Sequence, residues 1–224
     1  MIGKLTKVSR GLVLGTLATF SLQGCASLSK TEEGAVGGAA VGAVMGGIIS
    51  DNTAKGAILG AVIGGAAGAA IGRVMDQQAE ELEDNLPGAA VERVGEGIQV
   101  TFDSGILFDV DSDALRPEAQ RNLRELAESL GDYEGTSVLV VGHTDSTGSE
   151  EYNQRLSERR SAAARSFLVS AGLEAGRIEA VGRGETEPVA SNESVEGRQE
   201  NRRVEVAIFA SEELQEEAKR RAGN

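Results

Sequence analysis

The sequence predicts an α/β sandwich in which helices cover one face of a sheet, preceded by a glycine-rich helical hairpin. In the C-terminal half, short runs rich in valine and leucine alternate with helical runs, in the order strand–helix–strand–helix–strand–strand. In the N-terminal half, glycines recur at every fourth position over residues 34–72, with one break in the middle, and this period places them along helix faces. The chain of 224 residues has room for one ordinary domain with additional segments.

The predicted sheet domain spans residues 91–210. Pro117 can open a helix at its first position, and Thr147 followed by Glu150 has the spacing of a capping box. A Gly-Glu-Gly turn inside the first strand region predicts a hairpin or two short strands there. The elements expected are strands within 91–102, 136–143, 177–182 and 203–209, and helices over 117–131 and from 147–149 to near 172.

Residues 1–24 have the character of a secretory signal peptide. Three basic residues, Lys4, Lys7 and Arg10, precede an apolar region over 11–22 that is too short to span a bilayer. We therefore expect this segment to direct export and to be removed.

The only cysteine, Cys25, follows directly, in the sequence Leu-Gln-Gly-Cys. This ending resembles a bacterial lipobox, and the alternative is a lone buried cysteine beside an ordinary signal peptide. The resemblance implies a diacylglyceryl group on Cys25, cleavage before it, and a short polar tether over residues 25–33. Ala26, rather than aspartate, follows the cysteine, and in lipoproteins of this kind that implies the outer membrane. Acyl chains anchor firmly because each buried methylene contributes about 0.8 kcal/mol.

The glycine-rich segment 34–72 contains only two charged residues, Asp51 and Lys55. Each glycine costs a helix about 1 kcal/mol relative to alanine, so aligned glycines are expected only where the close approach of two helices offsets that cost. We therefore expect two antiparallel helices joined near residues 50–53. The segment resembles glycine-zipper domains of bacterial envelope proteins. Three fates remain open: a hairpin in the membrane, a face that associates copies into a homo-oligomer, or a flexible linker.

Two polar segments flank the sheet domain. Residues 73–90 are charged and favour a helix as far as Pro87-Gly88, so we expect a solvated helical linker there. Residues 211–224 are strongly polar, and we expect a terminal helix that frays as a C-terminal tail.

Composition excludes several classes of function. A net charge of −13 argues against binding to nucleic acid, and a single cysteine rules out internal disulfides. His143 is the only histidine, and the alternating Asp109, Asp111 and Asp113 lack the glycine and glutamate of an EF-hand loop. We therefore expect no metal, no cofactor and no enzymatic activity.

The stretch from Gly142 to Ser161 offers one carboxylate and one guanidinium, the pair of charges that a zwitterionic ligand needs. Asp145 lies in the turn after a predicted strand, close to a helix N-terminus. The alternative is that Asp145 and Arg160 form ordinary ion pairs with each other or with nearby residues. Four side chains share one stripe of the following helix, because their spacings are three, four and seven: Asn153, Leu156, Ser157 and Arg160.

These motifs resemble the peptidoglycan-binding core of the OmpA C-terminal-like family. The match includes Gly-His-Thr-Asp ending at Asp145, Tyr-Asn ending at Asn153, and Leu-Ser-Glu-Arg-Arg ending at Arg160, and it covers about half of the chain. The resemblance implies that the ligand is the diaminopimelate of the peptide stem, with its ammonium on Asp145 and its carboxylate on Arg160. It also implies supporting roles for four further residues: hydrogen bonds from Thr144 and Asn153, and a pocket lining from Leu156 and Ser157.

Around this pair, we expect the loop from Asp109 to Asp111 to form the rim of the pocket. Arg202 and Arg203 are expected to fix the last strand against acidic neighbours. The sequence as a whole indicates an outer-membrane lipoprotein whose C-terminal domain lies in the periplasm and binds peptidoglycan non-covalently. The alternative is an envelope-assembly protein that oligomerises through its glycine-rich helices, in which binding to the wall only positions the complex.

Overall fold

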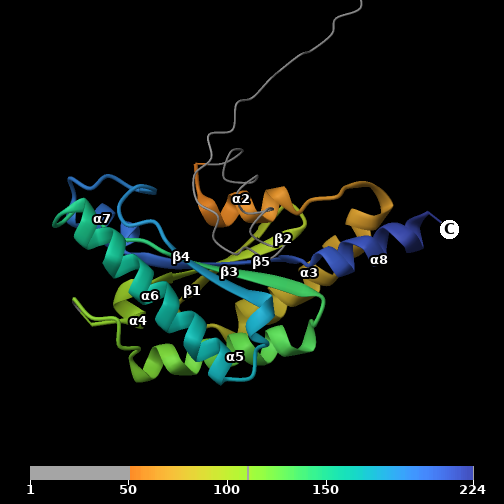
Figure 1. Ribbon diagram of the computed structural model, residues 1–224, viewed down its shortest axis with the longest axis horizontal. Helices are drawn as coiled ribbons and strands as arrows, with labels where there is room; N and C mark the ends of the chain where they lie inside the picture. Colours follow the sequence, from red (N-terminus) through yellow and green to blue (C-terminus); the bar gives the residue numbers. More distant parts are fainter. Residues whose placement is uncertain (1–50, 110, 224) are drawn as a thin grey trace, which may run out of the picture. The chain divides into compact units, whose positions relative to one another are not determined.

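The computed structural model describes residues 51–109 and 111–223, and these residues fold around a five-stranded sheet (Figure 1). The strands lie in the order β1-β2-β5-β3-β4, with β3 and β4 parallel and the other pairs antiparallel. This arrangement confirms the predicted α/β sandwich and the hairpin at its start. The strands are β1 (Ala89–Val94), β2 (Gly97–Asp103), β3 (Thr136–Gly142), β4 (Ile178–Gly182) and β5 (Arg203–Ala210).

The main core lies between one face of the sheet and the helices α5 (Pro117–Asp132) and α6 (Glu150–Ser170). Alternate residues of the central strands, such as Val140 and Val206, point into this core and are fully buried. Both helices were predicted, but α6 is capped by Ser149 instead of Thr147. The Ser149 Oγ accepts a hydrogen bond from the Tyr152 N–H at 3.2 Å, which satisfies one of the free donors of the first turn.

The linker predicted over residues 73–90 is helical, as expected, but it belongs to a packed helix, α3 (Gly65–Asn85), and is not solvated on all sides. Ile71, Met75 and Leu82 are nearly inaccessible to solvent and belong to the main core. Their spacing places them on one stripe of an otherwise acidic helix, so the composition is polar while one face is apolar. Within residues 51–109 and 111–223, no helix combines the length and the apolar character that crossing a membrane requires.

The part of the glycine-rich segment that forms α2 lies on the opposite face of the sheet. Thr53–Gly60 form α2, whose Ala57 and Ile58 pack on Leu139 and Phe209. Helices therefore cover both faces of the sheet, whereas the sequence predicted that they cover only one. The chain then leaves the helix, because the N–H groups of residues 63 and 64 donate to the Glu96 carboxylate at 3.0 and 2.8 Å.

This break means that residues 56–72 do not form one continuous limb of the predicted hairpin. Gly64 and Gly65 have φ values of 67° and 65°, a left-handed conformation that glycine adopts without strain. Gly68, in α3, is approached by the Glu96 side chain from the β1–β2 turn. The first limb, the signal peptide, the tether and Cys25 lie outside the described residues, so these remain predictions.

The C-terminal segment, expected to fray, forms α8 (Glu212–Ala222) and packs against α3. Leu214 and Ala218, four residues apart, turn toward the core, while the charged residues around them face solvent. Two short helices were not predicted: α4 (Ser104–Leu107), after β2, and α7 (Val195–Asn201), before β5. Both border the candidate site.

Candidate functional site

A cavity of about 420 Å³ opens where β3 ends, between α4, α6 and the start of β5. The loop after β3 contributes Thr144 and Asp145, and α6 contributes Asn153, Leu156 and Arg160. Five of the six predicted ligand-binding residues therefore lie together around one cavity, although they come from two separate elements.

Arg160 is a buried guanidinium, with only 5% of the residue exposed. Its Nε donates to the Ser112 carbonyl at 3.0 Å, and its guanidinium lies 5.3 Å from the centre of the Phe108 ring. Among residues 51–109 and 111–223, no carboxylate lies within 4.0 Å of its nitrogens. Burial lowers the pKa of Arg160, and the nearby Arg202 adds to this effect, while Asp111 opposes it. A positive charge is therefore held in the cavity without a paired carboxylate.

Asp145 supplies the negative charge and is 6% exposed. Its Oδ1 accepts the Thr147 N–H at 2.8 Å, and its Oδ2 accepts from the Arg202 guanidinium at 2.5 Å. Burial alone would raise the pKa of Asp145, but the hydrogen bonds from Arg202 and Thr147 outweigh it and lower the pKa. Asp145 is therefore a carboxylate at neutral pH. The two predicted charges do not pair with each other, which leaves Arg160 open to a ligand.

Arg202 does not have the role expected from the sequence. It was predicted to fix β5 against acidic neighbours, and Arg203 does so by pairing with Glu205 at 2.7 Å. Arg202, which precedes β5 directly, instead reaches the cavity and holds Asp145. The Arg-Arg doublet contained a signal for this difference, because consecutive residues near a strand point to opposite sides of the sheet.

Asn153 and Thr144 lie beside the pair of charges, as predicted. The Asn153 Nδ2 donates to the Asp145 carbonyl at 3.1 Å and to Glu185 at 2.5 Å, which fixes the loop against α6. The Thr144 N–H donates to the Gly184 carbonyl at 2.8 Å. Its hydroxyl is buried and has no hydrogen-bond partner in the part of the chain that the structure describes. Such a group is suited to a ligand, because a buried hydroxyl without a partner costs free energy.

Ser157 is the one predicted lining residue that does not line the cavity. It is fully buried, and its hydroxyl accepts the Gly184 N–H at 2.8 Å and donates to the Gln154 carbonyl at 2.7 Å. It faces Gly182, where an added Cβ would lie 2.5 Å from the serine Oγ and 2.4 Å from the Glu158 nitrogen. The missing side chain at Gly182 therefore lets α6 approach the sheet closely, and Ser157 packs in this contact.

The loop from Asp109 to Asp111 borders the cavity, as predicted, with Asp111 at a φ of 58°. Asp109 lies 3.7 Å from Arg116 in an exposed ion pair. Within the described ranges, no group of three or more acidic, histidine or cysteine side chains is arranged to hold a metal ion. Phe108 and Arg198, for which no individual role was predicted, also line the cavity.

The structure is an α/β sandwich whose cavity contains one buried carboxylate and one buried guanidinium. Two family models match parts of this chain. The model of the OmpA family matches residues 107–202, and the model of the YMGG-like Gly-zipper matches residues 6–76. The chain belongs to the OmpA family.

Among curated relatives, the chain is 42% identical over 113 residues to outer membrane protein A of Bordetella avium, across 50% of this chain and 58% of that protein. It is 38% identical to "Probable lipoprotein YiaD" of Escherichia coli, across 60% of this chain and 62% of that protein. It is also 38% identical to the peptidoglycan-associated lipoprotein of Mesorhizobium japonicum, across 54% of this chain and 71% of that lipoprotein. The first two matches thus span about three fifths of those relatives' own lengths.

One solved structure is similar to this chain in both fold and sequence. The cell wall anchor of the T6SS from Pseudomonas aeruginosa superposes with a TM-score of 0.55 at 38% identity. The superposition covers 60% of this chain and 97% of that one, so nearly the whole of that structure corresponds to part of this chain.

Proposed function

We propose that this protein is an outer-membrane lipoprotein that binds peptidoglycan non-covalently by holding the diaminopimelate of the peptide stem. One observation carries the proposal: the cavity contains Arg160, a buried cation with no described carboxylate within 4.0 Å of its nitrogens, together with the ionised Asp145. The free end of diaminopimelate has one ammonium and one carboxylate. A ligand with these two charges satisfies both residues.

In the bound state, the ligand carboxylate accepts hydrogen bonds from the Arg160 guanidinium, whose planar fork matches a carboxylate. The ligand ammonium donates to Asp145, in competition with Arg202 or beside it. The side chain of Arg202 is 39% exposed, so it can turn toward solvent or toward the ligand. The Thr144 hydroxyl, which has no partner among the described residues, then gains one.

The lipid anchor in this proposal is Cys25, which ends a sequence similar to a lipobox. The lipoprotein relatives support the same assignment for this chain. An anchor at Cys25 places the chain on the outer membrane with its binding domain in the periplasm, where the cell wall lies. The resulting function is a tether between membrane and wall.

We infer binding without catalysis. A zwitterionic ligand accounts for the buried charges of Asp145 and Arg160. Neither a nucleophile with an adjacent base nor a proton relay is needed to explain this arrangement.

The experiment that tests the function is co-sedimentation of the detergent-solubilised full chain with purified peptidoglycan. The wild-type protein is expected in the pellet, and Asp145→Ala and Arg160→Ala are expected in the supernatant. Arg159→Ala is the matched control, because Arg159 is the neighbouring arginine on α6 but is exposed and pairs loosely with Asp113 at 3.8 Å. Pelleting of folded Asp145→Ala and Arg160→Ala at the wild-type level would overturn the proposal.

The Gly-zipper match supports a second candidate, in which copies of the chain associate through their glycine-rich helices and wall binding positions the assembly. Sedimentation velocity of the full chain in detergent distinguishes the two. An oligomer that Gly38→Leu with Gly42→Leu dissociates favours assembly, whereas a monomer at all concentrations excludes it.

A further inference from the structure

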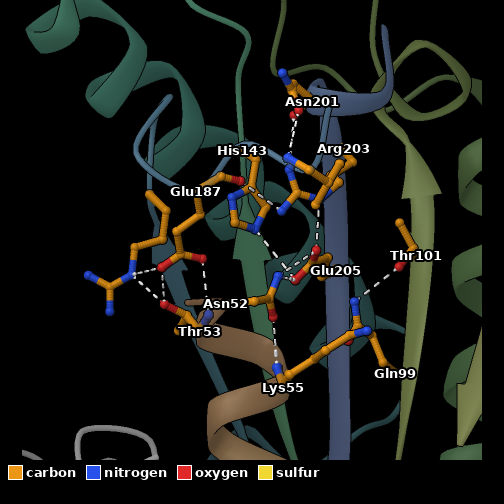
Figure 2. Close-up of polar contacts among 12 residues, drawn as sticks. Asn52, Thr53, Lys55, Gln99, Thr101, His143, Glu187, Asn201, Arg203 and Glu205 are labelled. Carbon is orange, nitrogen blue, oxygen red and sulfur yellow. Dashed lines mark hydrogen bonds and ion pairs between the residues drawn. The ribbon is translucent and has the colours of Figure 1, made fainter. Parts of the chain in front are cut away.

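The first turn of α2 is hydrogen-bonded to two carboxylates of the binding domain (Figure 2). The Asn52 Nδ2 donates to both carboxylate oxygens of Glu205, at 2.9 and 2.8 Å. The Thr53 hydroxyl and N–H donate to the two oxygens of Glu187, at 2.5 and 3.0 Å. We refer to these four residues as the α2 clasp. The contacts join parts of the chain more than 130 residues apart.

Two of the four clasp residues, Thr53 and Glu205, are buried, and Asn52 and Glu187 are partly buried. Glu205 is 1% exposed and also bonds to Arg203, while the Nε2 of His143 lies 3.6 Å from it. Burial would raise the pKa of Glu205, but His143, Arg203 and Asn52 outweigh it and hold the pKa at about 2. The Glu205 carboxylate is thus ionised in the interior, where the loss of a hydrogen-bond donor to it would destabilise the fold. Asn52 supplies two of its hydrogen bonds from α2.

The partners of the clasp are the immediate chain neighbours of the ligand-site residues. His143 precedes Thr144 and Asp145, and Arg203 follows Arg202. The His143 N–H donates to the Arg203 carbonyl at 2.9 Å, so the two strand ends are tied together at this point. Because successive side chains alternate between the faces of a sheet, one residue of each pair faces α2 and the next faces the cavity.

The loop after β4 makes a second bridge between the two faces. Glu187 accepts from Thr53 of α2, and Glu185, two residues earlier, accepts from Asn153 in the cavity. The Arg203 guanidinium donates to the Glu187 carbonyl at 3.1 Å and so joins this loop to β5. The clasp therefore braces the backbone that presents the ligand site at two points, β5 and this loop, and β3 is joined to β5 by the hydrogen bond from His143 to Arg203.

We propose that Asn52 and Thr53 are positioning residues for the ligand site, and that α2, when docked, holds Asp145 and Arg202 in the arrangement that receives the ligand. This inference rests on the proposed function. Because coupling between two sites is reciprocal, a bound ligand in turn stabilises the docked α2. The glycine-rich segment that leads into α2 is then linked to wall binding, and an event that pulls α2 from the sheet weakens the grip on the wall.

The test compares two substitutions at one position. Thr53→Val removes the hydroxyl with little change of shape, whereas Thr53→Ser keeps the hydroxyl. Lys55→Ala is the matched control on α2, because Lys55 is half-exposed and pairs with Glu92 outside the clasp. For the full chain in detergent, binding of a soluble muropeptide that contains diaminopimelate is measured by calorimetry. Thr53→Val should weaken it about threefold to tenfold, and the other two by less than about twofold.

A second readout separates positioning from general destabilisation. In the wild-type protein, the muropeptide should slow amide hydrogen exchange over residues 54–60 of α2, which do not line the cavity. The positioning role of the clasp would be refuted if folded Thr53→Val bound the muropeptide with wild-type affinity, or if the muropeptide left amide exchange in α2 unchanged. Neither result would contradict the proposed function. If the wild-type protein itself does not bind the muropeptide, the proposed function is wrong and the positioning role falls with it.

Discussion

Replacing Arg160 with methionine should separate ligand binding from folding. The substitution removes the guanidinium and keeps an unbranched stem beside Phe108. In the proposed complex, Arg160 makes charge-assisted hydrogen bonds to the ligand carboxylate, and such bonds contribute about 1.5–3 kcal/mol. The loss should weaken muropeptide binding by roughly tenfold to a hundredfold.

Stability should respond differently to the same change. Within the described residues, Arg160 has hydrogen bonds only to the backbone carbonyls of Ser112 and Asp109, and its burial without a carboxylate opposes folding. Removing the charge also removes its desolvation penalty and leaves no paired carboxylate behind, so the free energy of unfolding should change by less than about 1 kcal/mol. Calorimetry with the muropeptide and urea unfolding measure the two quantities on one sample. A folded Arg160→Met that binds like the wild-type protein would refute the role of Arg160.

Three further outcomes follow from particular residues. The pKa of Glu205, about 2 in the folded protein, lies below its ordinary value of 4.5. Glu205 therefore contributes stability that is fully present above pH 4.5 and is lost as the pH falls through about 2. In Glu205→Gln, the free energy of unfolding should fall less steeply over this acidic range, and the same fall as in the wild-type protein would contradict this. Gly182→Ala should destabilise the fold by about 1–3 kcal/mol in urea unfolding, because its Cβ would lie 2.4 Å from a backbone nitrogen of α6, and a stability equal to wild type would disprove the close contact. Cys25→Ser should abolish incorporation of radioactive palmitate in cells, and normal labelling would exclude the proposed anchor.

The sheet domain could be predicted because its local signals agree with one another. Val138 to Val141 lie in a short apolar run between glycines, Pro117 stands at a helix start, and the helix predicted to begin within residues 147–149 is capped by Ser149. The predicted ligand residues on α6 share a stripe whose spacing is visible in the sequence. Asn153, Leu156 and Arg160 are accordingly buried on one side of the helix.

The remaining features depend on contacts between distant parts of the chain. The apolar face of α3 is narrow and lies within acidic sequence, so its composition suggested a solvated linker. A helix rich in glycine and alanine, such as α2, fits a membrane, another helix or a sheet equally well. It docks on the sheet here because Asn52 and Thr53 donate hydrogen bonds to Glu205 and Glu187, which lie more than 130 residues away in the sequence. Ser157 shares the stripe of the ligand residues, but Gly182 brings the sheet close enough to cover it.

The central claim is that the cavity recognises an ammonium and a carboxylate at one end of the ligand. The most direct measurement compares two muropeptides that differ only in the third residue of the stem, diaminopimelate or lysine. Lysine keeps the ammonium that Asp145 receives but lacks the carboxylate that Arg160 receives. The diaminopimelate form should bind the wild-type protein about tenfold to a hundredfold more tightly, and this preference should disappear in Arg160→Met. Equal affinity of the wild-type protein for the two muropeptides would contradict the account.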